Sequence, residues 1–398
     1  MVSDSKDINP RTIRAHNIAA NAITTAKVGK KIIHTAAADP TTAADAGTGY
    51  EVGSLWNNTS SGELFICTDS SEEGSVWRGQ EGENVNYSPL WNGLTYAYEM
   101  GGSYPGPTVS TDAITRYPLA APYPQSDVGE QAQAGFSSCN CVGPGNVGFQ
   151  AGAYTPAGAY IGEVVSFPTA AATGVTTSNQ GELSRGGFAY GACGWSPTHG
   201  YTFGGQDPSS PGKTDTIEDF TFASFASSDT GAEMADGRDF TASADDATHS
   251  YQMGGWNPGT SDNIDRYQKG TSTNSTDTGE LAQSRYGVHG NSDVDGGYGY
   301  ANGGGGPPPL NEVDVIQRFP FAASTPSTDI GEMATTGAYG SMRGGSSMTH
   351  GHTSSRIGSP GPGTVRTRFP FASSSAGTDI GEVSNEANAN DDVGMICV

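Results

Sequence analysis

The chain is poor in charged residues, and most of those present are acidic. Only 15% of its 398 residues are charged, against about a quarter in an average protein, and 19 Lys and Arg stand against 42 Asp and Glu. A formal net charge of −23 repels phosphate backbones and anionic lipids, so we expect no nucleic acid partner. Low charge combined with 9% aromatic residues also argues against an intrinsically disordered chain.

Long apolar runs are missing as well. No run of 18 apolar residues occurs, so we expect no membrane insertion. The start, Met1–Asp7, lacks the apolar core of a signal peptide. The chain contains 58 Gly and 23 Pro, and each Gly disfavours a helix interior by about 1 kcal/mol. Because the period of three that collagen requires is also absent, the composition predicts an all-β chain with many tight turns.

Cysteine and histidine are scarce. The five Cys are an odd number without metal-site spacing, and Cys139-Asn140-Cys141 is too tight for a relaxed disulfide, so we expect buried, reduced thiols. Three of the seven His (His199, His249 and His350) occupy one repeat position. They could form a ring of metal ligands or stabilise a repeated turn. We favour the turn, and expect no metal and no cofactor.

Three sequence features recur together about every 50 residues. The first is Asp-x-Gly-Glu, which changes to Asn-x-Gly-Glu in one copy and carries an insertion in another; its glutamates are Glu130, Glu182, Glu233, Glu280, Glu332 and Glu382. Upstream lies an alternating strand with an aromatic residue at Tyr117, Phe167, Phe220, Tyr267, Phe319 and Phe369. Further upstream, the clearest copies of a third feature are strands that end in Gly101-Gly102, Gly204-Gly205 and Gly254-Gly255. Four short strands per repeat are typical of a β-propeller blade, with the aromatic residues filling the core between blades.

Six repeats predict a six-bladed β-propeller over residues 87–398. The sixth copy ends at Val393–Val398, whereas the Gly-Gly strand of the first copy, Leu94–Gly102, opens the repeat region. We therefore expect the C-terminal strand to pair with that first strand and close the ring. The Asp-x-Gly-Glu carboxylates could hold Ca²⁺, but an Asp that caps a turn before a Gly explains the same pattern, and we favour it.

The first 86 residues have a different character. Ile13, Ile18, Ile23 and Val28 recur every five residues, a period that fits neither a helix nor a strand. Residues 1–34 hold six Lys or Arg and two Asp or Glu, so this segment is basic while the rest is acidic. It could be a disordered basic tail or an ordered attachment segment. Residues 35–50 are predicted to be a linker and residues 51–86 a small β-hairpin module.

Several of these strings resemble known families. The Gly-Gly strand followed by an apolar-x-Arg-aromatic strand resembles kelch repeats. Tyr201–Gly205 followed by Thr216–Phe220 is similar to Gly-rich propeller repeats in structural proteins of marine tailed bacteriophages. The five-residue repeats (pentads) that contain Ile13, Ile18, Ile23 and Val28 resemble repeats at the N-termini of phage fibre proteins. Leu55–Trp77 is similar to a module that precedes phage tail-fibre tips.

These resemblances imply a non-enzymatic virion structural protein, a tail fibre or spike component made in the host cytoplasm. Residues 1–34 would attach it to other virion proteins through Ile13, Ile18, Ile23 and Val28, and a homo-oligomer is implied, with a trimer favoured. An architectural plug, capsid fibre or decoration protein is an alternative. A carbohydrate-active or metal-dependent enzyme is another, although no G-x-S-x-G, H-E-x-x-H or P-loop string occurs.

The connections after the Gly-Gly strands differ in every copy, and each contains Pro. Because variable loops on a rigid scaffold commonly carry recognition, we expect them on one face, where they would bind a host surface receptor or glycan. The candidate residues are Tyr104, Tyr154, Tyr160, Asp207, Trp256 and Asn257. The alternative is that these are ordinary solvent-exposed loops.

Overall fold

The computed structural model describes residues 33–41, 43–59, 64–71, 75–79, 95–102, 112–135, 138–143, 147–169, 173–208, 210–307, 313–337, 344–356, 364–382 and 394–397. The chain divides into two compact units, Met1–Ser88 and Pro89–Val398. All regular elements in the described ranges are β-strands, as the composition predicts. In these ranges there is no helix with the length and hydropathy needed to cross a membrane.

The first unit is a small four-stranded sheet. Its strands, in spatial order, are β1 (Ile33–Ala36), β2 (Leu55–Asn58), β3 (Leu64–Asp69) and β4 (Val76–Gly79). β1 pairs with β2 in parallel and the other pairs are antiparallel. Trp77 is fully buried at the centre of its core.

The predicted linker over residues 35–50 is wrong, because this segment is part of the first unit. β1 adds an edge strand to the sheet, and the ring of Tyr50 packs 5.3 Å from that of Trp77. The indole N–H of Trp77 donates to the carbonyl of Ala44 at 3.0 Å. A hairpin this short cannot bury its Trp alone, so the preceding small and aromatic residues cover it.

The described strands of the second unit form six sheets of four or five strands, which we call sheets 1 to 6, and one two-stranded hairpin. Sheet 1 consists of β5 (Tyr96–Met100), β6 (Ala113–Pro118), β7 (Ser126–Glu130), β11 (Val175–Thr176) and β31 (Gly394–Cys397). Sheets 2 and 3 consist of β8 (Cys139–Gly143), β9 (Val147–Tyr154), β10 (Tyr160–Pro168) and β12 (Ser178–Glu182), and of β13 (Ala192–Trp195), β14 (His199–Phe203), β17 (Thr216–Thr221) and β18 (Ser227–Glu233). Sheets 4 and 5 consist of β19 (Ala242–Asp245), β20 (His249–Met253), β21 (Ser261–Gln268) and β22 (Thr276–Arg285), and of β23 (His289–Asp293), β24 (Tyr298–Asn302), β25 (Val313–Pro320) and β26 (Thr328–Gly337). Sheet 6 consists of β27 (Gly345–Ser346), β28 (His350–Arg356), β29 (Thr364–Pro370) and β30 (Thr378–Glu382), and the hairpin of β15 (Gln206–Asp207) and β16 (Ser210–Lys213).

These small antiparallel sheets are consistent with a β-propeller-like fold. The first strands of successive sheets contact one another in the order β8, β13, β19, β23, β27 and β31, and β31 also contacts β8. Glycine permits this crowding: a Cβ on Gly290 would lie 1.9 Å from the carbonyl oxygen of Ser243, and one on Gly345 would lie 2.4 Å from the Sγ of Cys397.

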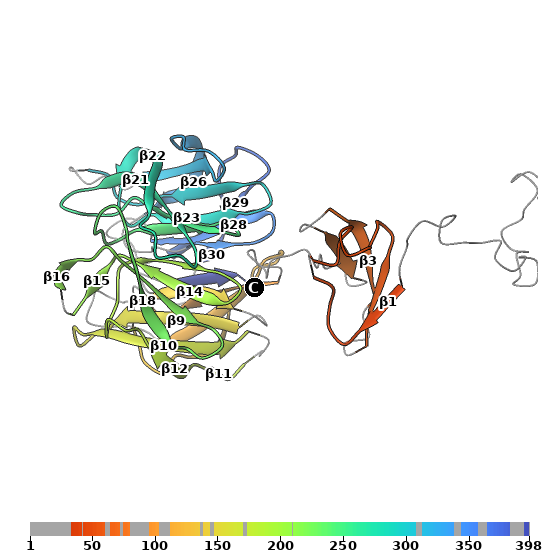
Figure 1. The fold of residues 1–398 in the computed structure, drawn as a ribbon. Helices are drawn as coiled ribbons and strands as arrows, with labels where there is room; N and C mark the ends of the chain where they lie inside the picture. Colours follow the sequence, from red (N-terminus) through yellow and green to blue (C-terminus); the bar gives the residue numbers. More distant parts are fainter. Residues whose placement is uncertain are drawn as a thin grey trace, which may run out of the picture. The chain divides into compact units, whose positions relative to one another are not determined.

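The C-terminal strand belongs to the sheet that opens the unit. β31 pairs antiparallel with β5, so that Gly394 lies opposite Met100 and Cys397 opposite Ala97. Figure 1 shows this dark-blue strand beside the orange and yellow strands from the beginning of the unit. This is the pairing that the sequence predicts for the two ends of the repeat region.

Aromatic side chains fill the space between every two successive sheets in the described part of the unit. The ring centroids are 5.7 Å apart for Tyr98 and Phe167, 4.6 Å for Phe149 and Phe222, 5.9 Å for Tyr201 and Tyr267, 4.8 Å for Tyr251 and Phe321, 4.9 Å for Tyr300 and Phe371, and 6.0 Å for Tyr117 and His352. The repeated aromatic residues of the alternating strand are all buried. Their predicted role as core between sheets is confirmed.

The two glycine-containing signatures have separate structural causes. In the Gly-Gly turn, Gly204 has φ +58°, and a Cβ there would lie 2.7 Å from the carbonyl oxygen of Arg238 in the next repeat. In Asp-x-Gly-Glu, the Asp carboxylate accepts a hydrogen bond from the Gly N–H at 2.8–3.1 Å; the Asp residues are Asp127, Asp229, Asp277, Asp329 and Asp379. The interpretation of this Asp as a turn cap is confirmed. The five Cys are all free and buried, as predicted.

Candidate functional site

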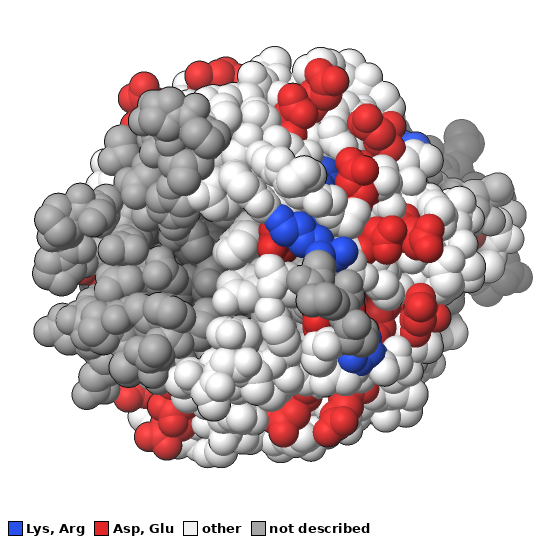
Figure 2. Space-filling model, turned by 90° about the vertical axis from the view of Figure 1, so that its left-hand side faces the viewer, with Lys and Arg blue, Asp and Glu red and all other residues white. Residues whose placement is uncertain are grey.

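The Gly-Gly turns place the described parts of the connections between second and third strands at one end of the sheets. We call this end the loop face; β15 and β16 lie on it, on the left in Figure 1. Figure 2 views the molecule from this side and shows many Asp and Glu side chains with few Lys and Arg. The overall charge of this face therefore attracts cations and repels anionic ligands.

Six aromatic rings follow one another across the loop face. We call them the aromatic arc: Tyr154, Tyr160, Tyr190, Phe240, Trp256 and Tyr286. Centroid distances along the arc are 5.0 Å from Tyr160 to Tyr154, 5.8 Å to Tyr190, 4.8 Å to Phe240, 6.0 Å to Tyr286 and 5.2 Å to Trp256. All six side chains are partly exposed. The arc is thus an open aromatic surface supplied by repeats from sheet 2 to sheet 5.

A polar network lies among these rings. The hydroxyl of Tyr160 donates to Gln206 Oε1 at 2.5 Å, and Gln206 Nε2 donates to Asp239 Oδ2. Lys213 Nζ lies 3.1 Å from Asp239 Oδ1 and 5.6 Å from the ring centroid of Trp256. Burial raises the pKa of Asp239, although Gln206 and Lys213 act in the opposite direction. The network offers hydroxyl, amide and paired charged groups beside aromatic faces, a combination that suits a hydroxyl-rich ligand.

Two residues of the arc have a strained backbone. Tyr190 has φ 62° and Phe240 has φ 54°, a left-handed conformation that costs about 1–3 kcal/mol for such residues. The N–H of Phe240 donates to the carbonyl of Tyr190 at 2.6 Å, and the N–H of Gly287 donates to that of Phe240 at 2.9 Å. Successive repeats therefore hold one another in this conformation. Strain of this kind is often retained where it serves a site.

The structure brings together three of the residues predicted from the loops. Tyr154, Tyr160 and Trp256 belong to the aromatic arc. Asp207 is buried in β15, so it supports the hairpin instead of facing a ligand. Asn257 is exposed beside Trp256, and its N–H donates to the carbonyl of Gly259. Tyr104 lies outside the described residues.

The predicted virion-docking residues Ile13, Ile18, Ile23 and Val28 also lie outside the described part of the chain. On the loop face, the sequence-based prediction missed Tyr190, Phe240 and Tyr286. A signal for them exists, because these aromatic residues recur about every 50 positions before the first strand of sheets 3, 4 and 5. The polar partners carry no such signal, since they come from a hairpin and a connection of different repeats.

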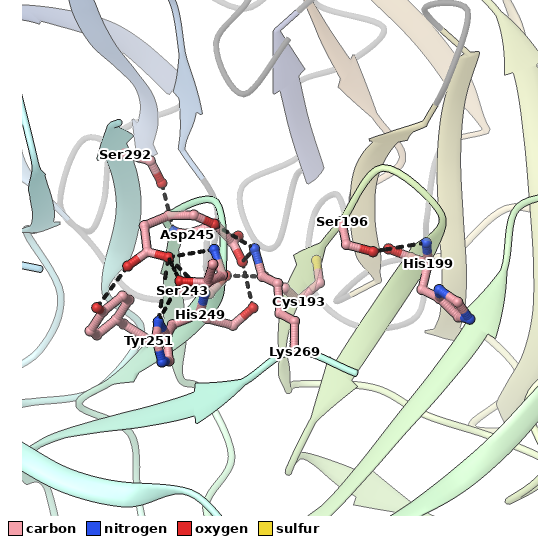
Figure 3. Close-up of polar contacts among 12 residues, drawn as sticks. Cys193, Ser196, His199, Ser243, Asp245, His249, Tyr251, Lys269 and Ser292 are labelled. Carbon is pink, nitrogen blue, oxygen red and sulfur yellow. Dashed lines mark hydrogen bonds and ion pairs between the residues drawn. The ribbon is translucent and has the colours of Figure 1, made fainter. Parts of the chain in front are cut away.

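A small polar cavity lies where the first strands of the sheets meet. Its volume is about 80 Å³, room for a few water molecules. Asn140, Cys193, Asp245, Asn291 and Cys397 line it together with neighbours from all six sheets. Side chains tie one strand to the next: Asp245 N–H donates to Ser292 Oγ at 2.8 Å (Figure 3).

One buried ion pair borders this cavity. Lys269 Nζ lies 2.9 Å from Asp245 Oδ1 and donates to the backbone carbonyl of Asp246 at 2.8 Å (Figure 3). Ser250 Oγ also donates to the carboxylate of Asp245. Burial raises the pKa of Asp245 and lowers the pKa of Lys269, and each partner opposes the other's shift. Since each charged group is already satisfied by its neighbour, the pair fastens the end of β21 to the turn after β19.

The repeated histidines stabilise turns. Each accepts or donates a hydrogen bond with the preceding Thr hydroxyl at 2.7–2.8 Å, and each backbone N–H donates to a side chain three residues earlier; the residues are His199, His249 and His350. This is the turn interpretation favoured from the sequence. Within the described ranges, no three His, Cys, Asp or Glu side chains converge as metal ligands do.

No family model matches the chain, and no curated protein is significantly similar to it.

Proposed function

We propose that sheets 1 to 6 are the blades of a six-bladed, kelch-like β-propeller closed by the pairing of β31 with β5. The order of contacts among the first strands, which leads from β8 through β27 to β31 and back to β8, supports this proposal. One aromatic contact between every two successive sheets supports it as well. A ring of this kind leaves only short sheet edges exposed and holds its loops rigidly.

We further propose that the protein is a bacteriophage virion component, a tail fibre or spike, that binds a host surface receptor or glycan through the loop face. The aromatic arc is the observation that carries this proposal. Its rings are partly exposed and accompanied by a polar network, and two of them, Tyr190 and Phe240, are held by a strained backbone. Binding energy at protein surfaces is concentrated on such preorganised aromatic residues.

The N-terminal features support attachment to a particle. The pentads and the basic charge of residues 1–34 contrast with the acidic second unit, and Leu55–Trp77 resembles a module found before phage tail-fibre tips. Residues 1–34 are proposed to bind other virion proteins, and a trimer is the proposed assembly. If the loop face is instead covered by other proteins in the intact particle, the architectural alternative is favoured.

Binding of the purified full-length protein to host cells tests the loop-face proposal. We expect Trp256→Ala to weaken binding about tenfold or more, because Trp256 is an aromatic anchor beside Lys213. Tyr298→Ala is a matched control, since Tyr298 is also a partly exposed aromatic residue but begins β24 at the opposite end of the strands. Equal binding of the two variants would contradict the proposal.

Truncation tests the attachment proposal separately. Removal of residues 1–32 ends just before β1, so both compact units should still fold. We expect the truncated protein to be absent from purified particles while it still binds host cells. Incorporation at the normal level would show that attachment does not depend on the pentads.

A further inference from the structure

A groove lies between sheet 6 and sheet 1, at the ends of the strands opposite to the loop face. Its volume is about 520 Å³, within the range of small-molecule sites. Tyr123, from the connection between β6 and β7, forms one side. His350 at the start of β28, Arg368 and Pro370 at the end of β29 and residues 375–380 form the other.

Arg368 is a cation without a carboxylate partner in this groove. Its guanidinium donates to the hydroxyl of Tyr123 and lies 2.8 Å from His350 Nε2, and no carboxylate of the described residues is within ion-pair distance of it. Its Nε is buried and has no acceptor. Burial and the charge of Arg368 lower the pKa of His350 to about 4, so His350 is neutral near pH 7.

The same repeat position shows how unusual this arginine is. Arg116 covers the ring of Tyr96 at 4.3 Å, and Arg318 covers that of Tyr298 at 4.4 Å. In sheet 6 the corresponding position on the second strand is His350, and Arg368 instead reaches 5.8 Å from the ring centroid of Tyr123 in the neighbouring sheet. The guanidinium at this position therefore stacks on its own sheet in sheets 1 and 5 but lines a groove in sheet 6.

The remaining lining suits a sugar ring that carries an acid group. Tyr123, Pro370 and Ile380 offer apolar surface, and Ser375 and Thr378 bring hydroxyl-bearing side chains. The acidic residue Asp379 is held in its turn by the Gly381 N–H at 2.8 Å. A guanidinium binds a carboxylate through two parallel hydrogen bonds, which a neutral sugar cannot accept in that form.

We propose that this groove binds a carboxylate-bearing sugar residue, with the carboxylate on Arg368 and the ring against Tyr123. The site is independent of the aromatic arc, because the two lie at opposite ends of the strands. The protein would then contact two chemically different parts of a glycan-coated surface, one through aromatic rings and one through charge.

Titration of the full-length protein with three small probes tests this assignment, by ligand-observed NMR and calorimetry. The probes are glucuronate, the uncharged analogue glucose, and inorganic phosphate. We expect glucuronate to bind at least about tenfold more tightly than either of the others, and Arg368→Gln to weaken it by about tenfold or more. Arg318→Gln, at the same repeat position but outside the groove, should leave glucuronate binding unchanged.

Thermal unfolding of each variant establishes that it is folded before titration. Arg368→Lys retains the charge but not the paired N–H groups, so it should bind glucuronate less tightly than the wild type and more tightly than Arg368→Gln. The proposal is overturned if glucose binds as well as glucuronate, if phosphate alone binds, or if Arg368→Gln and Arg318→Gln behave alike. Because Trp256→Ala leaves this groove intact, failure here is distinguishable from failure of the loop-face proposal.

Discussion

Two neighbouring interfaces of the second unit, between sheets 5 and 6 and between sheets 6 and 1, are held together by different kinds of contact. Between sheets 5 and 6 the contact is apolar: Tyr300 lies 5.4 Å from Phe369 and 4.9 Å from Phe371, over the buried Ile316 and Met333. The hydroxyl of Tyr300 also donates to the backbone carbonyl of Phe371 at 3.4 Å. Burial of aromatic surface dominates this interface.

Between sheets 6 and 1 the contact is polar. Arg366 occupies a position where the five other repeats have Ile or Val, and its Nε and Nη2 donate to the two carboxylate oxygens of Glu99 at 2.9 and 2.8 Å. Ser354 donates to the same carboxylate, and the guanidinium covers the ring of Tyr117 at 4.6 Å. Both charged side chains are 1% exposed. His352 takes the place that Tyr300 has in sheet 5.

This difference coincides with the one place where the ends of the repeat region meet. Glu99 and Arg366 are separated by 267 positions in the sequence. An apolar contact tolerates small shifts in register, whereas a bidentate ion pair with further hydrogen bonds is satisfied in one arrangement only. We infer that the polar network fixes the register of sheet 6 against sheet 1.

Removal of residues 394–398 should have the largest effect on this comparison. It deletes β31, so β5 loses one of its two antiparallel partners and keeps only β6, and the interface between sheets 6 and 1 loses Met395 and Cys397 from its core. We expect loss of a single cooperative unfolding transition, and self-association through the exposed edge of β5. Denaturant unfolding and size-exclusion chromatography measure these effects; an unchanged midpoint with the elution volume of the wild type would show that the pairing of β31 with β5 is dispensable.

Glu99→Ala should have the next largest effect. It leaves the guanidinium of Arg366 buried without its carboxylate, and breaking a buried pair in this way typically destabilises by about 3–5 kcal/mol. The double variant Glu99→Met with Arg366→Ile makes this interface apolar like the one between sheets 5 and 6. It should recover most of the lost free energy of unfolding in denaturant titrations. If the double variant is as unstable as Glu99→Ala, packing alone, and not the unpaired charge, accounts for the loss.

Acid should weaken the interface between sheets 6 and 1 more than the apolar interface between sheets 5 and 6. Burial, with Arg368 and His350 nearby, lowers the pKa of His352 to about 3, against about 6.5 in the unfolded chain. The unfolded state therefore binds a proton first as the pH falls, so the stability that neutral His352 contributes is complete above about pH 6.5 and decreases towards pH 3. His352→Gln should flatten this part of the pH dependence of the unfolding midpoint, whereas His34→Gln, in the first unit, should not. Equal slopes for the two variants would contradict this role of His352.

Most of the arrangement of the sheets could be predicted from the repeated sequence features. Aromatic residues spaced about 50 apart indicated the core positions, and the capping role of Asp-x-Gly-Glu followed from turn chemistry, because both depend on local geometry that is identical in each copy. The prediction of residues 35–50 as a linker failed for the opposite reason. That segment has a loop-like composition, and only its contact with Trp77 gives it a structure.

The candidate sites divide in the same way. Tyr154, Tyr160 and Trp256 could be predicted because Gly-Gly turns send variable loops to one face. Their continuity with Tyr190 and Phe240 could not, since it depends on left-handed residues that neighbouring repeats hold in place. The groove at Arg368 could not be predicted either, because Arg occupies the same repeat position in sheets 1 and 5, where it stacks on a tyrosine ring.

The sequence by itself therefore determined the all-β class, the repeat, and the strands at its two ends that can pair, because period, glycine content and turn chemistry act over short distances. Only the tertiary structure decided which charges are neutralised and which stay free. Arg366 and Arg368 are two residues apart on one strand, yet the first is buried against Glu99 and the second opens into a groove. Residues two apart on a strand point to the same side, so the difference comes from what lies beside each of them, which is set by residues hundreds of positions away.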